Sequence, residues 1–402
     1  MRHRLFHVLA GVLGLAAATS PLAAGTIRHD RNDQLYRSAA RSPAMEAVVA
    51  LLVDGSPSCS GTLIAPQWVL TATHCIWPFP PLLLPRQTVV VNGQRFEVGP
   101  EDIFINPEWL AGGFDVLSTR GDIALIRLPR PVTGVTPIAL NRGTGEVGQW
   151  GYMAGFGSTG TGRTGNSVNT SLKRAGVNVI DATVATISFP ERFPAEQSVL
   201  VGSSRALLTD FDNSARNSST LGAPDPLNME YTTAKGDSGG PLLLYRDGVF
   251  TVAGVTSGGI DGYDGTSSQA SFYSDTATFT RVASYIRWIE RVMRGNEPSL
   301  RQYFRDPEET SAGNIAEAAD RQRQRAAELL RKGWRLQMRT PLADALPLGA
   351  AGQTSRPMLQ PAHLEQEFPG LALLMRHVEQ VLAQHAAASN DDGHSARCCR
   401  CQ

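Results

Sequence analysis

Short apolar runs, separated by stretches of Gly, Pro, Asn and Ser, follow one another from about Ala47 to Phe279 and limit the fold more than any other feature. The runs read AVVALLV, TLIAPQWVLTA, QTVVV, DIALIRL, VGQWGYMAGF, PLLLY and FTVAGVT. Runs of this kind, bounded by turn-forming residues, are typical of β-strands. No stretch of about 10 to 15 residues in this span has the helical period that an alternating α/β fold needs. The pattern therefore predicts an all-β barrel or sandwich.

The period changes after this span. Apolar residues recur at steps of three and four from Val282 to Met293, and Gly295 follows as a stop signal, which predicts one helix closing the domain. Residues 296–402 differ again, with NIAEAADRQRQRAAELLRKGW typical of a charged helix and LALLMRHVEQVLAQH typical of a helix with one apolar face. A linker with Pro and Gly separates the two. We therefore expect a mostly α-helical C-terminal extension.

The amino terminus has the three parts of a signal peptide. MRHR is basic, LFHVLAGVLGLAAA is apolar, and TSPLAAG is a region of small residues where cleavage would occur. A membrane anchor is the alternative, but crossing a bilayer takes about 20 apolar residues. We therefore predict that residues 1–25 form a signal peptide, removed near Ala24 or Gly25, and that the protein is secreted or periplasmic.

Charge and cysteine content narrow the partners and the chemistry. The chain has 37 basic and 37 acidic residues, which gives no electrostatic reason to expect nucleic acid or an anionic membrane as a partner. Only Cys59 and Cys75 lie between residues 26 and 300, and an oxidising compartment would allow them to pair. The other three, Cys398, Cys399 and Cys401, crowd the C-terminus without the spacing of a complete zinc site. We expect a disulfide between the first two and no metal.

One motif carries chemistry: in TTAKGDSGGPLLL, Ser238 lies between an acid and two glycines and precedes an apolar run. A serine nucleophile needs a base, and His74, in WVLTATHC, is the only one of eight histidines within the β-rich span. The imidazole in turn needs a carboxylate, which Asp122 supplies directly before the run IALIRL. Each residue also has a plain structural interpretation, a turn serine or a surface acid, and the pair His29 and Asp30 is a less suitable catalytic alternative. Asp102 and Asp115 compete with Asp122, but neither leads directly into such a run.

The motifs CSGTLIAPQWVLTATHC, GDIALIRL, GFG at 155–157, GDSGGP and AGVTSGG resemble the chymotrypsin/trypsin family of serine proteases, over residues of about 40–295. The resemblance implies two packed antiparallel β-barrels of the chymotrypsin-like type, with the active site in the cleft between them. It implies that Ser238 is the nucleophile, His74 the general base and acid, and Asp122 the carboxylate that orients it. The backbone N–H groups of Gly236 and Ser238 would form the oxyanion hole, and Ser257 would support the aspartate.

The sequence also departs from the family pattern. Proteases that cleave after Arg or Lys have an aspartate where this chain has Thr232, and Gly258 and Gly259 leave the pocket wall open. We therefore expect a neutral substrate side chain of small to medium size at P1, the residue on the N-terminal side of the cleaved bond. Ala234 replaces a common family cysteine, so the second half of the domain lacks the usual disulfides.

Activation is a further departure. In the family, a freed Ile or Val amino group pairs with the aspartate that precedes the nucleophile, here Asp237. No IVGG-like sequence is present, and Ile27 is the only apolar candidate near the expected signal cleavage. The alternatives are cleavage of the chain at another position, or an enzyme that needs no cleavage to become active. Within the long stretch 181–230, FDNSARNSSTLGAPDPLN reads as an extended loop, and DGYDG at 261–265 reads as a turn rather than a calcium site.

These observations predict three parts: a signal peptide at 1–25, a protease domain at 26–295 and an extension at 296–402. The predicted function is a secreted serine endopeptidase that cleaves protein or peptide substrates through an acyl-enzyme, without a cofactor, a nucleic-acid partner or a membrane span. The alternative is a binding protein without enzymatic activity on a protease scaffold. For the extension we expect a docking element for a partner, with a loosely ordered tail or an inhibitory segment as alternatives.

Overall fold

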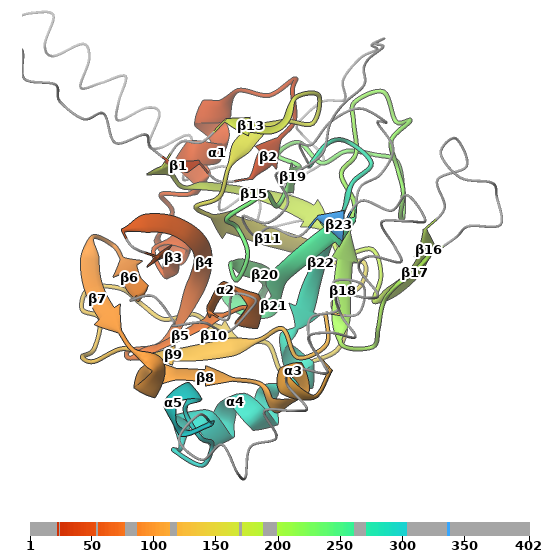
Figure 1. Cartoon of the computed structure of the whole chain (residues 1–402). Coiled ribbons are helices and arrows are strands. Elements are labelled where there is room, and N and C mark those ends of the chain that lie inside the picture. Colours follow the sequence, from red (N-terminus) through yellow and green to blue (C-terminus); the bar gives the residue numbers. More distant parts are fainter. Residues whose placement is uncertain are drawn as a thin grey trace, which may run out of the picture.

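The computed structural model describes residues 22–23, 25–53, 55–76, 87–112, 119–168, 171–187, 199–260, 271–303 and 336–337. Most of these residues belong to β-strands, and two large curled sheets make up the body of the molecule (Figure 1). Short helices lie around the sheets and between them. The predicted all-β architecture, of the trypsin-like type, is confirmed.

The first sheet has seven strands, and every pairing in it is antiparallel. Their spatial order is β7 (Gln94–Val98), β6 (Gln87–Val91), β3 (Val48–Val53), β4 (Ser56–Ala65), β5 (Trp68–Thr71), β9 (Ala124–Arg127) and β8 (Ile103–Ile105). The run AVVALLV supplies β3, whose residues are nearly all buried. Its aliphatic side chains therefore form part of the core inside this curled sheet.

The second sheet has eight strands. Six of them follow the order β15 (Arg174–Val179), β11 (Trp150–Gly155), β20 (Pro241–Arg246), β21 (Val249–Ile260), β22 (Thr276–Arg281) and β18 (Ala206–Thr209). Two short strands also pair with β21: β10 (Ala139–Leu140), which is parallel to it, and β23 (Leu336–Gln337), which is antiparallel. The two apolar runs PLLLY and FTVAGVT form the centre of this sheet, in β20 and β21.

A smaller sheet anchors the N-terminal part of the described chain. Its order is β13 (Gly165–Val168), β12 (Thr159–Thr161), β2 (Thr26–Ile27) and β19 (Tyr231–Thr232). Two further pairs are β1 (Leu22–Ala23) with β14 (Ser171–Leu172), and β16 (Val184–Ile187) with β17 (Val199–Gly202). The stretch 181–230 contains β16, β17 and β18, and residues 211–228, predicted as an extended loop, follow β18 without a helix or strand.

The helices are short. They are α1 (Asp33–Ala39), α2 (Thr73–Ile76), α3 (Pro107–Gly112), α4 (Ile286–Met293) and α5 (Leu300–Tyr303), with 3-10 turns at Pro43–Met45, Pro100–Asp102 and Val282–Ser284. No helix within the described ranges is both long enough and apolar enough to cross a membrane.

The predicted closing helix is confirmed, and its first turn is a 3-10 turn. Gly295 adopts φ +78° just beyond α4, and its N–H donates to the carbonyl of Val292 while that of Asn296 donates to Arg291. This pair of bonds ends the helix as a Schellman motif. The predicted helices of the extension, the three C-terminal cysteines, the 261–265 turn and most of the predicted signal peptide lie outside the described residues.

Candidate active site

His74 lies on α2, directly after strand β5, between the two large sheets (Figure 1). Its ring Nδ1 is 2.8 Å from Oδ2 of Asp122, and its backbone N–H donates to Oδ1 of the same carboxylate at 3.0 Å. The hydroxyl of the neighbouring Thr73 donates to the carbonyls of Gly121 and Ile123, on either side of the aspartate. The histidine and the aspartate are therefore held together by backbone and side-chain bonds at once.

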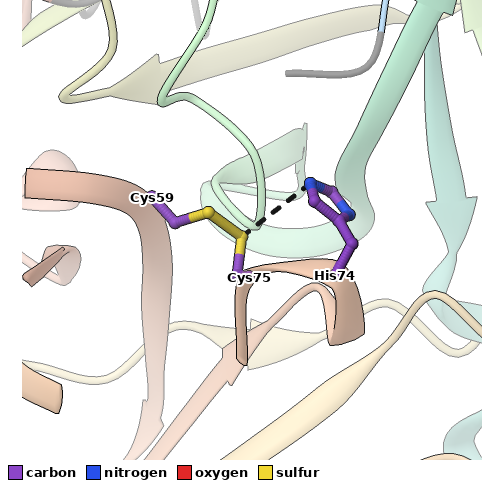
Figure 2. A group of neighbouring side chains, drawn as sticks. All are labelled: Cys59, His74 and Cys75. Carbon is purple, nitrogen blue, oxygen red and sulfur yellow. Dashed lines mark hydrogen bonds between the residues drawn. A yellow bond between two sulfur atoms is a disulfide. The ribbon is translucent and has the colours of Figure 1, made fainter. Parts of the chain in front are cut away.

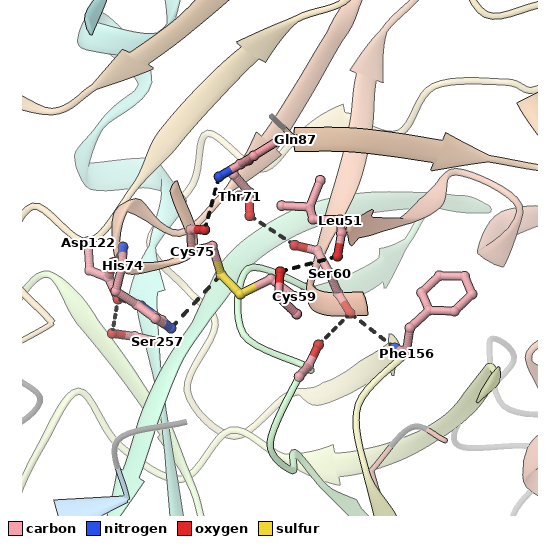
Figure 3. Close-up of a disulfide and its surroundings, with 12 residues drawn as sticks. Leu51, Cys59, Ser60, Thr71, His74, Cys75, Gln87, Asp122, Phe156 and Ser257 are labelled. Atoms are coloured by element: carbon pink, nitrogen blue, oxygen red, sulfur yellow. Dashed lines mark hydrogen bonds and ion pairs between the residues drawn. A yellow bond between two sulfur atoms is a disulfide. The ribbon is translucent and has the colours of Figure 1, made fainter. Parts of the chain in front are cut away.

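Asp122 is fully buried at the start of the segment that becomes β9. Besides His74, its Oδ2 accepts the hydroxyl of Ser257 at 2.5 Å (Figure 3). Its own carbonyl accepts the hydroxyl of Thr280 at 2.9 Å, and the preceding Gly121 donates its N–H to the hydroxyl of Tyr285. Ser257, Thr280 and Tyr285 come from the second sheet and the end of the domain, so this carboxylate is fixed from both halves.

The competing acids do not share this environment. Asp102 forms an ion pair with Arg127 at 3.4 Å, near the surface of the first sheet. Asp115 lies outside the described residues. The pair His29 and Asp30 lies elsewhere: His29 contacts the hydroxyl of Tyr273 at 2.7 Å, and Asp30 binds Arg28.

Ser238 is fully buried in the turn that precedes β20. Its carbonyl accepts the N–H of Ser60 from the first sheet at 2.8 Å, whereas its hydroxyl oxygen has no hydrogen-bond partner among the described residues. The next residue, Gly239, has φ +79°, and a Cβ there would lie 2.1 Å from the hydroxyl oxygen of Thr71. The serine turn therefore packs closely on β4 and on the end of β5, the strand that leads into the His74 helix.

Gly236 shapes the backbone on the other side of the serine. It has φ +94°, and a Cβ there would lie 2.8 Å from Cα of Gly157, so the position favours glycine for both conformation and space. Ser60 also supports this turn, because its hydroxyl donates to the carbonyl of Gly236 and accepts the N–H of Phe156 (Figure 3). Within the described ranges, the N–H groups of Gly236 and Ser238 have no acceptor, so both can donate to a further group.

Asp237 separates these two N–H donors and points away from solvent, with 1% of its surface exposed. Its Oδ1 accepts the N–H of Gly157 at 2.9 Å, and its Oδ2 accepts the N–H of Ala234 at 2.8 Å. Its Oδ2 also accepts the N–H of Gly25 at 2.9 Å. The N-terminal segment thus reaches this aspartate through Gly25 rather than through Ile27, which lies within strand β2.

The predicted pocket residues come from two strands. Thr232 lies in β19 with its hydroxyl buried and without a hydrogen-bond partner in the described part of the chain, and Ser257, Gly258 and Gly259 lie together in β21. In register with the two glycines across the β21–β22 pair are Thr278 and Ala277. The described part of the extension meets the same strand, since Gly259 pairs with Gln337 of β23.

A disulfide joins Cys59 of β4 to Cys75 of α2, next to His74 (Figure 2). The two sulfurs and the His74 ring nitrogen lie within 4.8 Å of one another, an arrangement that would resemble a metal site if the cysteines were free. Thiolates, not disulfide sulfurs, are the ligands that metals take. The bridge instead ties the strand that supports the Ser238 turn to the helix that carries His74.

Sequence reasoning missed a group of neighbouring carboxylates: the buried Asp210, Asp212 and Glu230, and the half-buried Asp181. Burial, reinforced by the neighbouring acids, raises the pKa of Asp181 to about 7 and that of Asp212 to about 8. Glu230 accepts the N–H groups of Asp212 and Leu227, yet its burial raises its pKa well above the usual range. These acids lie in a stretch rich in Asn, Ser and Gly, where acids are ordinarily exposed.

Comparison with known proteins agrees with this architecture. The Trypsin family model matches residues 37–289, which is more than half of the chain. Snake venom serine proteinase 4a of Crotalus adamanteus is 28% identical over 73% of this chain and 96% of its own length, and chymotrypsin-like elastase family member 1 of Macaca fascicularis is 27% identical over 60% and 80%.

Among solved structures, neuropsin, a serine protease expressed in the limbic system of mouse brain, is 21% identical. The match covers 62% of this chain and 96% of the neuropsin chain, with a TM-score of 0.42. The extent of the family match decides the classification: this chain belongs to the trypsin family.

Proposed function

We propose that the protein is an exported serine endopeptidase in which Ser238 attacks the substrate carbonyl, with His74 as base and Asp122 as its orienting partner. The observation that carries this proposal is a chain of contacts from Ser257 through Asp122 to His74. His74 lies on α2, the helix that follows β5, and the Ser238 turn packs against the end of that strand. Among the described residues, the serine hydroxyl has no hydrogen-bond partner that would compete with His74 for its proton.

The order of proton transfers follows from the positions of the ring nitrogens. Asp122 accepts a proton-bearing Nδ1, which leaves Nε2 of His74 as the basic nitrogen. Nε2 takes the Ser238 proton during attack, and the imidazolium then gives that proton to the leaving amine. The acyl-enzyme that remains is hydrolysed when the same nitrogen activates water.

The negative charge that develops on the substrate oxygen needs donors that are already in position. The N–H groups of Gly236 and Ser238 flank Asp237, whose carboxylate is fixed by three backbone N–H groups. Each donor of an oxyanion hole contributes about 3 kcal/mol to stabilising the transition state. Because the turn is fixed before substrate arrives, this stabilisation does not require the donors to reorganise.

The pocket supports a preference for neutral P1 side chains. Thr232 stands at the predicted floor with a buried hydroxyl that has no partner, so it can hydrogen-bond a polar, uncharged group. A buried ammonium or guanidinium would need a carboxylate there, because an unpaired buried charge is costly. Gly258 and Gly259 add no side chains that would narrow the pocket.

Export and the division of the chain belong to the same proposal. The basic, apolar and small-residue segments within 1–25 support a cleaved signal peptide, and one relative is a venom protein by its name. Residues 26–295 would form the protease unit. The extension from residue 296 would be an accessory element, and its described part touches the protease: Leu300 is fully buried, and Arg301 pairs with Glu101 at 3.2 Å.

Hydrolysis by purified protein tests this function. We expect cleavage of an unfolded protein and of chromogenic peptides by the wild type and by Ser219→Ala, a loop serine whose hydroxyl binds the carbonyl of Leu221. Ser238→Ala should lose this activity. Near-normal hydrolysis by Ser238→Ala would refute the assignment, and a folded wild type that binds a protein without cleaving any substrate would favour the binding-protein alternative.

A further inference from the structure

The contact between Gly25 and Asp237 joins residues that are 212 positions apart in the sequence. The other two backbone donors to this carboxylate, Gly157 and Ala234, come from segments that border the site. The Tyr231 hydroxyl lies 3.3 Å from Oδ2 as well. The N-terminal segment is therefore the most distant contributor in sequence among these contacts, and it reaches the residue directly before the proposed nucleophile.

Gly25 is fixed from its C-terminal side. Its carbonyl accepts the hydroxyl of Thr159 at 2.6 Å, and Thr26–Ile27 pair with β12 on one side and β19 on the other. These bonds act on Gly25 from the residues that follow it, whereas Leu22–Ala23, before it, pair separately with β14. A chain that began at Gly25 would keep every one of the bonds from Gly25 onward.

Space and conformation both require glycine at this position. Gly25 is buried with φ +50°, and a Cβ on it would lie 1.9 Å from the ring of Tyr231. An Ile or Val, which the family resemblance leads one to expect, could not occupy this place beside the tyrosine. The Tyr231 ring instead fills the volume that such a side chain would need.

The predicted signal cleavage falls at the same point. The small residues LAAG end at Gly25, and removal near Ala24 or Gly25 was expected from the sequence alone. We propose that signal peptidase cuts between Ala24 and Gly25, that the freed α-ammonium of Gly25 pairs with Asp237, and that this pair holds the Ser238 turn in its reactive form. Export and activation are then a single step with no second protease, which rests on the proposed serine-protease function.

The chemistry of this step is a peptide-bond hydrolysis. Water adds across the Ala24–Gly25 bond, Ala24 leaves as a carboxylate, and the Gly25 nitrogen takes up protons to become an ammonium. An α-amino group has a pKa of about 7.7–8.0, so the charged form predominates near neutral pH even before a partner carboxylate favours it further. The amide supplies one neutral donor at 2.9 Å from Oδ2, whereas the ammonium supplies three donors and a full charge.

Two otherwise identical chains test the proposal. Each is released from a fusion whose removal leaves a defined first residue, one chain beginning at Gly25 and the other at Ala24. We expect the second chain to have a kcat/KM on peptide substrates about 10- to 100-fold lower, because its Gly25 nitrogen is an uncharged amide. Removal of that single alanine by an aminopeptidase should restore activity.

The Asp237→Asn variant, made with both first residues, separates a positioning role from general destabilisation. If the ammonium acts through Asp237, the two Asp237→Asn chains should have equally low activity, because the extra alanine then has no ion pair to break. If the retained Ala24 merely weakened the fold, the Asp237→Asn chain that begins at Ala24 would be less active than the one that begins at Gly25. That result would overturn the proposal.

The remaining outcomes are also decisive. Mass spectrometry of the exported protein should find Gly25 first, and an active exported chain that begins at another residue would overturn the inference. Equal activity of the chains beginning at Gly25 and at Ala24 would do the same while the protease function stood. If no form is active, including the chain that begins at Gly25, the proposed function itself fails and this inference fails with it.

Discussion

The two large sheets hold their functional residues by different means. In the first-sheet half, a disulfide ties β4 to α2 beside His74, and a largely aliphatic core lies beneath. In the second-sheet half no cysteine occurs among the described residues, and hydrogen bonds and ion pairs of buried polar groups hold the loops and strands in place. Arg281 pairs with the fully buried Glu146 at 2.5 Å, and Asp237 accepts three backbone N–H groups.

This difference predicts different sensitivities. The half that contributes His74 and Asp122 depends on a covalent bond and should respond to reductant. The half that contributes Ser238 and the pocket depends on carboxylates whose pKa values burial has raised, as for Asp181 and Asp212, and should respond to pH. The proposed hydrolysis would thus depend on residues from two halves that are stabilised in different ways.

The largest expected effect concerns Ser238 and His74, which come from different halves of the molecule. Replacing Ser238 or His74 by alanine should each lower kcat on the order of 10⁶-fold, and the double variant should be no worse, because the two groups act as a unit. Steady-state kinetics on a chromogenic peptide measures this. His29→Ala is the matched control and should retain activity; additive losses in the double variant would contradict a shared role.

The pocket in the second-sheet half gives the next effect. Thr232→Asp would place a carboxylate at the proposed pocket floor, which is buried, and a cationic P1 side chain could pair with it there. We expect the ratio of kcat/KM for Arg over Leu at P1 to rise about 100-fold. Profiling with a peptide library measures the ratio. An Arg or Lys preference already present in the wild type would show that the pocket assignment is wrong.

Loss of the disulfide should weaken the first-sheet half. Replacing both Cys59 and Cys75 by alanine removes a cross-link of 16 residues, worth about 3 kcal/mol in the chain-entropy model. For a domain of this size the Tm should fall by about 6–12 °C. Calorimetry with and without reductant checks the expectation, since reductant should lower the Tm of the wild type but not of the variant. A wild type insensitive to reductant after unfolding and refolding would contradict it.

The pH response of the second-sheet half should be smaller. Burial raises the pKa of Asp212 from 3.8 to about 8, so its contribution to stability is fully present below about pH 4 and is lost as pH rises through 8. Asp212→Asn should therefore raise the Tm above pH 8 by about 3 °C, or about 1 kcal/mol. Thermal melts from pH 5 to 9 measure this. Asp102→Asn, in the 3-10 turn before β8 of the first sheet, is the control. An equal rise in Tm there would contradict the predicted difference between the halves.

The smallest effect concerns the extension. β23 occupies the edge of β21 at Gly259, beside the predicted pocket. A chain that ends after Tyr303 keeps the buried Leu300 but frees this edge, on which an extended peptide could form backbone bonds. We expect an unchanged kcat and a KM about threefold lower. A loss of activity in a folded truncated chain would show that the extension contributes to the reaction.

The sequence predicted the strands and the closing helix because their signals are local. Period-two and apolar runs bounded by turn residues mark β3, β20 and β21, and Gly295 marks the end of α4. The site residues could be selected because each stands beside a strand in a short motif, although their catalytic roles remain predictions.

The features that sequence reasoning missed depend on distant partners. The Gly25 contact with Asp237 requires β2 to insert between β12 and β19, and no residue near Gly25 signals that pairing. Likewise, the bond from Gly121 to Tyr285 spans 164 positions. The carboxylates at 210 and 212 resemble surface acids in the sequence, and only the packing of β18 and the following loop buries them.

Labelling with a fluorophosphonate probe is the most direct test of the central claim, that Ser238 is activated by His74 from the opposite half of the molecule. Such a probe reacts with an activated serine whatever the P1 preference. We expect peptide mass spectrometry of the folded chain beginning at Gly25 to find the label on Ser238, and neither His74→Ala nor heat-unfolded wild type to be labelled. Labelling of His74→Ala at the wild-type rate, or a folded wild type with no label on Ser238, would contradict it.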